Sequence, residues 1–300
     1  MFPAGSPEAE AAPAAPDDDD RDEIEITPVR PALSAAIAAF AGVLGVGLIF
    51  GAQSTSPGAR LSFALVVFGV QVLFLLAWTM ATRPPALIAV GAVGLAAAAV
   101  ADRVAVTSAQ AGIMPLVLVA LAGLAVAVGS QLVRPGDRRR VTESLRATAL
   151  LVLGVVALAT LIVLSRIPLG TQVIFICLAA AAFALVVARL TDALHPKPRL
   201  APQVPRGAAG VIFGAMAGTL ASAVIGSFLY TFSPTSGAVI GLVAAVAAVL
   251  ADLAADFAEA GRQMAGDPPT LWVARHMQGP LGGFALAAPA AYAMTVLFLT

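Results

Sequence analysis

The sequence is poor in charge. Lys, Arg, Asp and Glu make up 11% of its 300 residues, 60% of the residues are hydrophobic, and the mean hydropathy is +0.94. Soluble domains are about 25% charged and about 45–50% apolar. Too few polar side chains remain here to cover a water-soluble fold, which excludes a soluble enzyme, a nucleic-acid-binding protein and a disordered chain. The hydrophobic runs are continuous and do not alternate in period two, which also excludes a β-barrel.

Cysteine is nearly absent. The single Cys177 lies in an apolar run, so no intrachain disulfide can form, and we expect it to be a small core residue. The N-terminus lacks the basic start of a signal peptide. Nine of the 17 acidic residues lie in the first 30 positions, among them the run Asp17–Asp20. We therefore predict a disordered acidic tail over residues 1–30 and one multi-pass transmembrane domain over residues 31–300.

Long apolar runs fill the rest of the chain. A helix needs about 20 mostly apolar residues to cross a hydrocarbon core of about 30 Å. Nine segments qualify: Ala32–Gly51, Leu61–Ala81, Ala86–Ala101, Gly112–Val133, Ala147–Ser165, Thr171–Ala188, Gly207–Phe232, Gly237–Ala255 and Pro280–Leu299. The predicted fold is an all-α, polytopic membrane helical bundle of about nine helices. The third segment is short and rich in alanine, and without it eight remain.

Basic residues predict the orientation. With the N-terminus inside, 14 of the 17 lysines and arginines fall in cytoplasmic segments and only Arg60, Arg103 and Arg166 fall outside. Cytoplasmic loops are enriched in Lys and Arg, so we predict a plasma (inner) membrane protein with a cytoplasmic N-terminus and an external C-terminus. The cytoplasmic loops include Arg134–Arg146, with five arginines, and the basic, proline-containing stretch Arg189–Arg206. Both suit anionic membrane lipids as partners.

Ionisable side chains inside a membrane are costly and usually functional. The first seven predicted spans contain no Asp, Glu, Lys or His at midplane depth, which disfavours a coupled transporter. Gln71 is their most polar central residue, and an interhelical hydrogen bond explains it. Gly210, Gly214 and Gly218 recur every four residues, a spacing that favours close helix packing.

Acidic residues gather where the eighth span leaves the membrane. At 100° per residue, Asp252, Asp256 and Glu259 share one helical face. Carboxylates on one face can hold Mg²⁺ and share it with substrate phosphates. The alternative is a helix that emerges into water, with Glu259 paired to Arg262. That alternative explains Glu259 well and Asp252 poorly, because apolar turns precede Asp252.

The last third of the chain shows three motifs in order. RLAPQVPRGAAGVIFGAMAGTLASAVIG, ADLAADFAEAGRQMAGD and RHMQGPLGGFALAAPAAYA resemble the Leu-Ala-Pro loop with its Gly-rich helix, the Gly-Asp-Leu to Lys-Asp stretch and the closing segment of bacterial CDP-diacylglycerol synthases (phosphatidate cytidylyltransferases). The resemblance covers about residues 189–293. It implies cytidylyl transfer from CTP to phosphatidate at the inner membrane face, with Mg²⁺ held by acidic residues.

Several family residues are missing. Asp252 and Asp267 match family aspartates and His276 lies near the family histidine, but the family's Asp-Arg-x-Asp carboxylates fall on Gly279 and Gly282. Phosphoryl-type transfer depends on charge neutralisation and positioning, so these losses should cost orders of magnitude in rate. The candidate catalytic and Mg²⁺-binding residues of an active enzyme are Asp252, Asp256 and Asp267, and the candidate cofactor-binding residues are Arg206, Arg262 and His276.

Three interpretations follow from these patterns. The first is a catalytically degenerate relative of the family, without a cofactor, that binds a lipid or a protein partner at a groove facing the cytoplasm. The second is an active Mg²⁺-dependent phosphatidate cytidylyltransferase. The third is a transporter or a membrane assembly subunit. A homo-oligomer is compatible with each of them. His195 and His276 lack ligand-spaced partners, so we interpret them as surface residues and not as a zinc site.

Overall fold

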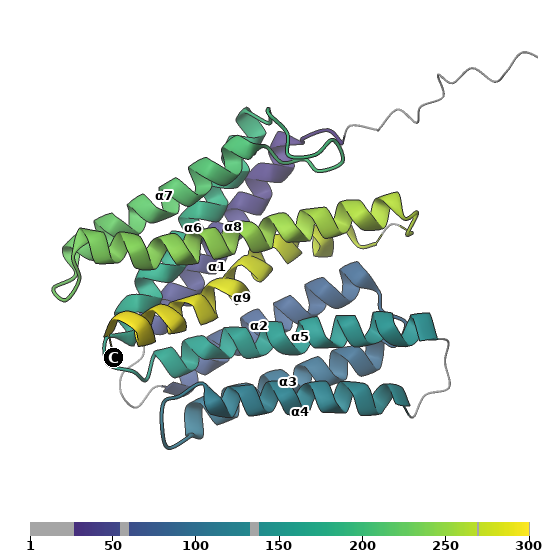
Figure 1. Ribbon diagram of the computed structural model, residues 1–300, viewed down its shortest axis with the longest axis horizontal. Helices are drawn as coiled ribbons and strands as arrows, with labels where there is room; N and C mark the ends of the chain where they lie inside the picture. The colour runs from purple at the N-terminus through teal and green to yellow at the C-terminus, as the bar shows by residue number, and fades with distance from the viewer. Residues whose placement is uncertain (1–26, 55–59, 133–137, 269, 300) are drawn as a thin grey trace, which may run out of the picture.

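The computed structural model describes residues 27–54, 60–132, 138–268 and 270–299. These residues form nine helices and no strand (Figure 1). The helices are α1 (Pro31–Gln53), α2 (Arg60–Thr82), α3 (Leu87–Thr107), α4 (Met114–Leu132), α5 (Arg138–Leu164), α6 (Gly170–Leu194), α7 (Ala208–Phe228), α8 (Pro234–Met264) and α9 (Trp272–Leu299). The predicted all-α multi-pass membrane bundle is confirmed.

Eight of these helices are long and apolar enough to cross a membrane. The shorter one is α4, whose apolar part covers residues Met114–Ser130. At 1.5 Å per residue, the 19 residues of α4 extend about 28 Å, close to the thickness of a hydrocarbon core. The expectation that the third span is the short one is wrong, because α3 continues six residues past Ala101.

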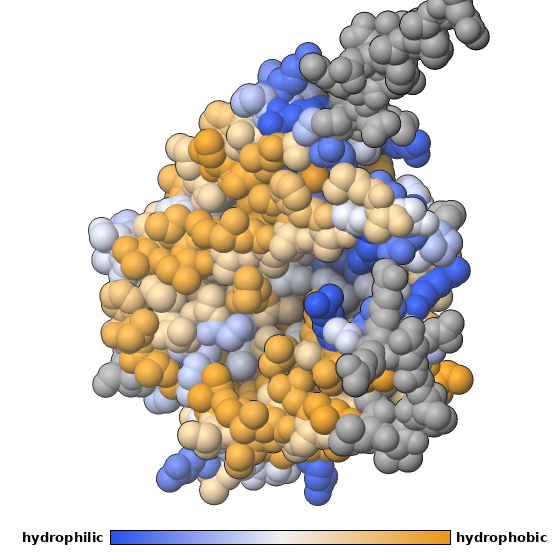
Figure 2. All heavy atoms as spheres, turned by 45° about the vertical axis from the view of Figure 1, so that its right-hand side comes forward, coloured by the Kyte–Doolittle hydropathy of each residue, from blue (hydrophilic) through white to orange (hydrophobic). Residues whose placement is uncertain are grey.

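The helices form two groups joined by α9. In one group α3 and α5 pack on each other and on α2 and α4, and in the other α6 packs on α1, α7 and α8. Helix α9 contacts α2 and α5 on one side and α6 and α8 on the other, and it lies between the two groups in Figure 1. Hydrophobic side chains cover most of the face seen in Figure 2, and hydrophilic ones gather toward its edges. This distribution suits a protein surrounded by lipid.

Small residues bring α7 close to its neighbours. Gly210, Gly214 and Gly218 are buried in the contact with α6. A Cβ added at Gly214 would lie 2.6 Å from the carbonyl oxygen of Ala184, and one at Gly218 would lie 2.4 Å from that of Ala180. The predicted packing role of this spacing is confirmed.

Helix boundaries differ from the expected spans near the C-terminus. Helix α8 continues to Met264, past Gly261, and Gly266 ends the turn after it with a φ of +74°. Helix α9 begins at Trp272, so Pro280 lies inside it and does not start it. Pro289 also lies inside α9, whereas Pro115 occupies the first turn of α4, where proline is tolerated without a kink.

Most of the predicted acidic tail, residues 1–26, lies outside the described residues. Thr27 donates its backbone N–H to the carbonyl oxygen of Pro202 at 3.1 Å and accepts a hydrogen bond from Arg199 at 2.5 Å. The chain therefore enters α1 beside the loop between α6 and α7.

Candidate functional site

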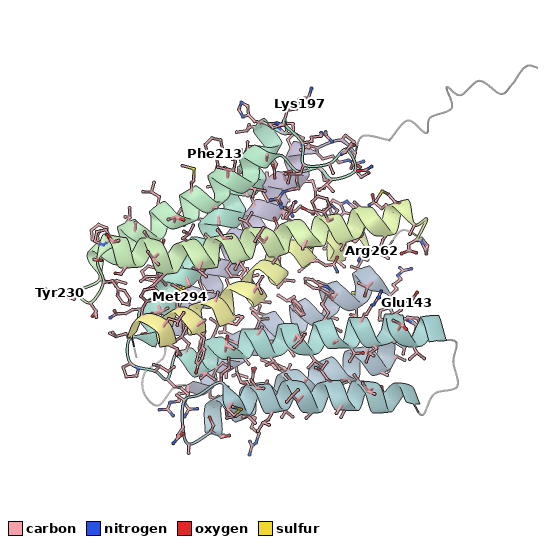
Figure 3. The ribbon with its side chains drawn as sticks, viewed as in Figure 1. Glu143, Lys197, Phe213, Tyr230, Arg262 and Met294 are labelled. Carbon is pink, nitrogen blue, oxygen red and sulfur yellow. The ribbon has the colours of Figure 1, made fainter. Side chains whose placement is uncertain are left out.

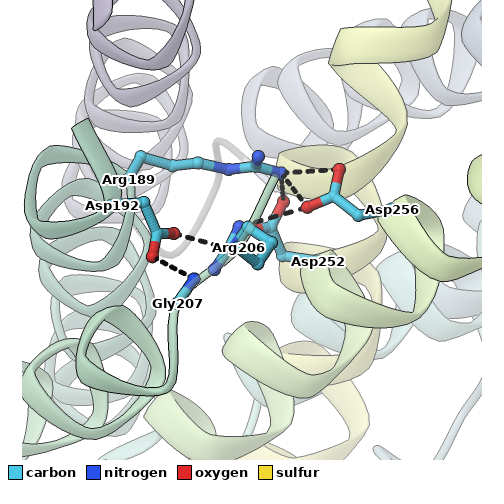
Figure 4. A network of polar contacts seen from close by, with 6 residues as sticks. All are labelled: Arg189, Asp192, Arg206, Gly207, Asp252 and Asp256. Atoms are coloured by element: carbon cyan, nitrogen blue, oxygen red, sulfur yellow. Dashed lines mark hydrogen bonds and ion pairs between the residues drawn. The ribbon is translucent and has the colours of Figure 1, made fainter. Parts of the chain in front are cut away.

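The carboxylates of α8 contact two separate groups of residues, and Asp252 and Asp256 belong to the first. Asp252 and Asp256 are four residues apart within α8, so their side chains lie one above the other on one face. Asp252 is fully buried, and Asp256 is partly exposed. Both face α6 and the loop that precedes α7 (Figure 4).

Two arginines approach these carboxylates from other parts of the chain. Arg189, near the end of α6, places Nη2 2.5 Å from Asp252 Oδ1 and 3.0 Å from Asp256 Oδ2. Arg206, in the loop before α7, donates to Asp252 Oδ2 and lies 3.3 Å from Asp256 Oδ2. Each guanidinium therefore contacts both aspartates.

A third carboxylate holds Arg206 in place. Arg206 Nε lies 2.7 Å from Asp192 Oδ2, and the backbone N–H of Gly207 donates to Asp192 Oδ1 at 2.8 Å. Asp192 thus links the end of α6 to the start of α7. We call Arg189, Asp192, Arg206, Asp252 and Asp256 the ion cluster (Figure 4).

Burial makes this pairing necessary. Taking a charge out of water costs several kcal/mol, and a partner with good hydrogen bonds must offset that cost. Arg206 and Asp252 are both 0% exposed, and Arg189 is 5% exposed. Each of the three carboxylates contacts at least one of the two guanidiniums, although two positive charges do not fully balance three ionised carboxylates.

Gly279 completes the enclosure of Asp252. A Cβ added at Gly279 would lie 1.9 Å from Asp252 Oδ1 and 3.0 Å from Arg189 Nη2. The backbone of α9 therefore lies directly against the Asp252–Arg189 pair. Gly279 is one of the two positions at which the sequence comparison places a family carboxylate. In this structure the close backbone contact leaves no room for a side chain there.

The predicted Mg²⁺ ligands do not come together. Asp252 and Asp256 meet in the ion cluster, whereas Asp267 lies beyond the end of α8 and lines a separate cavity. His276 contacts the carbonyl oxygen of Trp272 through Nδ1 at 2.7 Å and does not line that cavity, and it lies close enough to Arg189 and Asp256 for their charges to act on it. Across the described ranges, no group of three or more His, Cys, Asp or Glu side chains is arranged to hold a metal ion.

A cavity of about 1290 Å³ lies beside α8, next to Glu259 and apart from the ion cluster. Its walls come from α2, α5, α8 and α9, so it occupies the space between the two helix groups. The space-filling view in Figure 2 shows a recess between an upper and a lower part of the molecule, with hydrophilic residues at its edge. We call it the large cavity.

The large cavity has an apolar part and a polar part. The side chains of Phe74, Trp78, Leu150, Leu153 and Leu286 line the first, and Phe74 and Trp78 stack with ring centroids 4.3 Å apart. Arginines and acids line the second: Arg83, Glu143, Arg146, Glu259, Arg262, Asp267 and Arg275. Glu143 and Arg262 lie at the same end of the bundle, and Tyr230 lies at the other end (Figure 3).

Only some of these arginines are paired. Glu259 contacts Arg262, as predicted, and it also contacts Arg275 at 2.6 Å. Arg83 and Arg146 are exposed and form no ion pair with any described residue. Arg83 follows the last residue of α2 with a φ of +42°, a left-handed conformation that is unusual for a residue with a side chain.

Sequence reasoning misplaced two arginines and missed one aspartate. The stretch Arg189–Arg206 was expected to be an irregular basic loop, but α6 continues to Leu194, and Arg189 and Arg206 turn inward. Asp192 was not singled out. The available signal was its spacing of three residues from Arg189, which places both on one face of a helix.

Comparison with known proteins adds no identification. The chain matches no protein-family model and no curated protein. The resemblance to CDP-diacylglycerol synthases therefore stays a prediction.

Proposed function

We propose that this protein binds an anionic phospholipid in the large cavity and does not transfer nucleotidyl groups. The observation that carries the proposal is the division of that cavity into an apolar part and an arginine-containing part. A phospholipid has the same division, with hydrocarbon chains at one end and a phosphate at the other. Binding sites for such ligands combine apolar walls with a few placed polar groups.

Arg83 and Arg146 are the proposed phosphate ligands. They come from the end of α2 and from α5, so a phosphate between them would contact both helices. A guanidinium hydrogen-bonds phosphate with two parallel donors, and charged hydrogen bonds of this kind are about twice as strong as neutral ones. Arg262 and Arg275 are already engaged by Glu259 and would contribute less.

The ion cluster supports the absence of transfer chemistry. Magnesium-dependent transfer needs carboxylate oxygens free to bind the ion. Here the oxygens of Asp252 already accept hydrogen bonds from Arg189 and Arg206. Gly279 and Gly282 supply no carboxylate, and the described residues hold no other metal-binding group.

The orientation follows from the same arginines. Positive charge near a membrane favours the cytoplasmic side. Because Glu143 and Arg262 lie at one end of the bundle, the polar part of the large cavity lies at the end rich in arginine. We infer that this end faces the cytoplasm of an inner membrane.

A titration with fluorescent phosphatidate in detergent micelles tests the binding. The wild-type protein should bind the probe saturably, and the double variant Arg83→Gln/Arg146→Gln should bind it at least about tenfold more weakly, because two charged hydrogen-bonding groups are lost. Arg103→Gln is the matched control. It removes an exposed arginine from α3, outside the cavity, and should change the affinity less than about twofold. Equal affinity in all three proteins would refute the proposal.

A second assay separates binding from catalysis. Purified protein is incubated with CTP, Mg²⁺ and phosphatidate, and the lipid extract is analysed for CDP-lipid. We expect no turnover above a protein-free sample. Steady CDP-lipid formation that Asp252→Ala abolishes would replace the proposal with the active cytidylyltransferase.

A further inference from the structure

A buried polar pair lies in the helix group that does not contain the ion cluster. Gln71 occupies the middle of α2, and Asp102 lies in the second half of α3. Gln71 is 0% exposed and Asp102 is 6% exposed. The predicted third span ends at Ala101, whereas α3 continues to Thr107 and therefore includes Asp102.

The hydrogen bonds of this pair are incomplete in a specific way. Gln71 Nε2 donates to Asp102 Oδ1 at 2.8 Å and to the carbonyl oxygen of Val155 at 2.9 Å, which uses both amide hydrogens. Gln71 Oε1 and Asp102 Oδ2 are buried, and neither has a hydrogen-bond partner in the described part of the chain. Gln71 Oε1 can only accept a hydrogen bond, and so can Asp102 Oδ2 as long as the carboxyl is ionised, so the two atoms cannot satisfy each other in that state.

No cation among the described residues forms an ion pair with Asp102. The helices packed against α3 are α2, α4 and α5. Helix α2 carries one charged residue, Arg60 at its start, and α4 carries none. The charged residues of α5 lie between Arg138 and Arg146, in its first turns. Arg103 is exposed, and none of the ion pairs among the described residues includes Asp102.

Arg166, which follows α5, is the remaining candidate, but both of its terminal nitrogens donate to groups other than Asp102, and its Nε has no hydrogen-bond partner among the described residues. Nη1 donates to the carbonyl oxygen of Ala105 at 2.6 Å and to Ser108 Oγ at 2.9 Å, and Nη2 donates to the carbonyl oxygen of Ser108 at 2.6 Å. An ionised Asp102 would therefore be a buried charge without a counter-ion, which costs far more than a neutral carboxylic acid.

We propose that Asp102 and Gln71 form a proton-binding site in which the Asp102 carboxyl carries a proton at neutral pH. Uptake of one proton converts Oδ2 into a donor, and no other bond forms or breaks. The unpaired Gln71 Oε1 is then the matching acceptor. The acid and the amide form a reciprocal pair, with Gln71 Nε2 donating to Oδ1 and Asp102 Oδ2 donating to Oε1. One proton thus satisfies both unpaired oxygens.

This site is independent of the proposed lipid binding. Neither Gln71 nor Asp102 lines the large cavity, and neither belongs to the ion cluster. Loss of phosphatidate binding would leave the proton site unaffected, and the reverse also holds.

Infrared spectroscopy of the detergent-purified protein tests the proposal. The C=O stretching band of a protonated carboxylic acid is separate from the bands of carboxylates, so the spectrum of wild type minus that of Asp102→Asn at pH 7 should contain one acid band. Glu143→Gln removes an exposed carboxylate and should leave that band in place. A difference spectrum without the band, or an equal loss in both variants, would overturn the proposal.

Thermal unfolding gives a second measurement. Asparagine supplies the same donor and acceptor without a titratable group, so Asp102→Asn should fold and have an unfolding midpoint similar to that of wild type near pH 4, where the aspartate is protonated in the folded and the unfolded chain. Above about pH 4 the unfolded wild type releases a proton that the folded protein holds, so the wild-type midpoint should fall relative to that of Asp102→Asn as the pH rises from about 4 to about 7. Parallel pH profiles would overturn the proposal.

A sodium titration followed by infrared spectroscopy is a third test. Loss of the acid band on adding Na⁺ to a sodium-free sample would also overturn the proposal, because the site would then hold a metal cation.

Discussion

Two charged regions along α8 differ in how their charges are paired. In one, Asp252 and Asp256 meet Arg189 and Arg206 in a largely buried cluster, with Gly279 packed against it. In the other, Glu259 meets Arg262 and Arg275 at the edge of an open cavity of about 1290 Å³. The same residue types therefore form a structural contact in one place and the wall of a binding site in the other.

Completeness of pairing distinguishes the two regions. In the ion cluster both arginines are held by carboxylates and are shielded from water. At the cavity, Arg83 and Arg146 remain without a carboxylate partner among the described residues and are exposed. A buried charge must be paired for the fold to form, whereas an exposed one is available to a ligand. Residues of the first kind should control stability, and residues of the second kind should control binding.

The largest expected effect comes from Arg206→Ala. Removal of this fully buried guanidinium leaves Asp192, Asp252 and Asp256 with Arg189 alone, and breaking a buried pair in this way costs about 3–5 kcal/mol. Arg262→Ala removes an arginine that also pairs with a carboxylate but is 23% exposed, and it should cost less than about 1 kcal/mol. Unfolding midpoints in detergent compare the two. If Arg206→Ala lowered the unfolding midpoint no more than Arg262→Ala, the ion cluster would not contribute more to stability than the exposed pair at the cavity.

The sequence predicts the membrane class, most helices and the local contacts within them. The Glu259–Arg262 pair and the glycine spacing of α7 are correct because helical periodicity alone determines which residues share a face. The ion cluster was not predicted. Arg189 and Asp252 are 63 residues apart, and no periodic pattern records which helices are neighbours. Basic residues in or near predicted loops were interpreted as signals of membrane orientation. That interpretation does not distinguish exposed arginines from those that turn inward, such as Arg189 and Arg206.

Asp102 was missed for a different reason. The third span was predicted to end at Ala101, where the apolar run stops, but α3 continues to Thr107. A charged residue ends an apolar run in the sequence without ending a helix. The hydrogen-bond donor to Asp102 is Gln71 on α2, which lies 31 residues away in the sequence.

A smaller effect is expected from Gly279→Ala. The new methyl group would collide with Asp252 Oδ1, which cannot move without losing its contact to Arg189, so we expect a loss of about 1–3 kcal/mol in stability. Gly261→Ala is the matched control on the exposed part of α8. A Cβ there meets nothing within 4 Å and should stabilise the helix by about 0.5–1 kcal/mol. Opposite signs in thermal unfolding would show that the enclosure at Asp252 is tight, and a neutral Gly279→Ala would show that it is not.

The smallest effect on stability is expected from Arg83→Gly, where stability and binding should change in opposite directions. Arg83 has a left-handed backbone directly after α2, a position that glycine usually occupies at the end of a helix. Glycine should remove the strain and raise the stability by about 0.5–1 kcal/mol, while the lost guanidinium weakens phosphatidate binding. Arg83→Gln keeps a Cβ and therefore the strain, so it should weaken binding without raising the unfolding midpoint. Strained residues that persist in a structure are commonly retained for function. If Arg83→Gly left the phosphatidate affinity unchanged, ligand binding would not explain the strained backbone of Arg83. Arg83 would then be a surface charge without a role in binding.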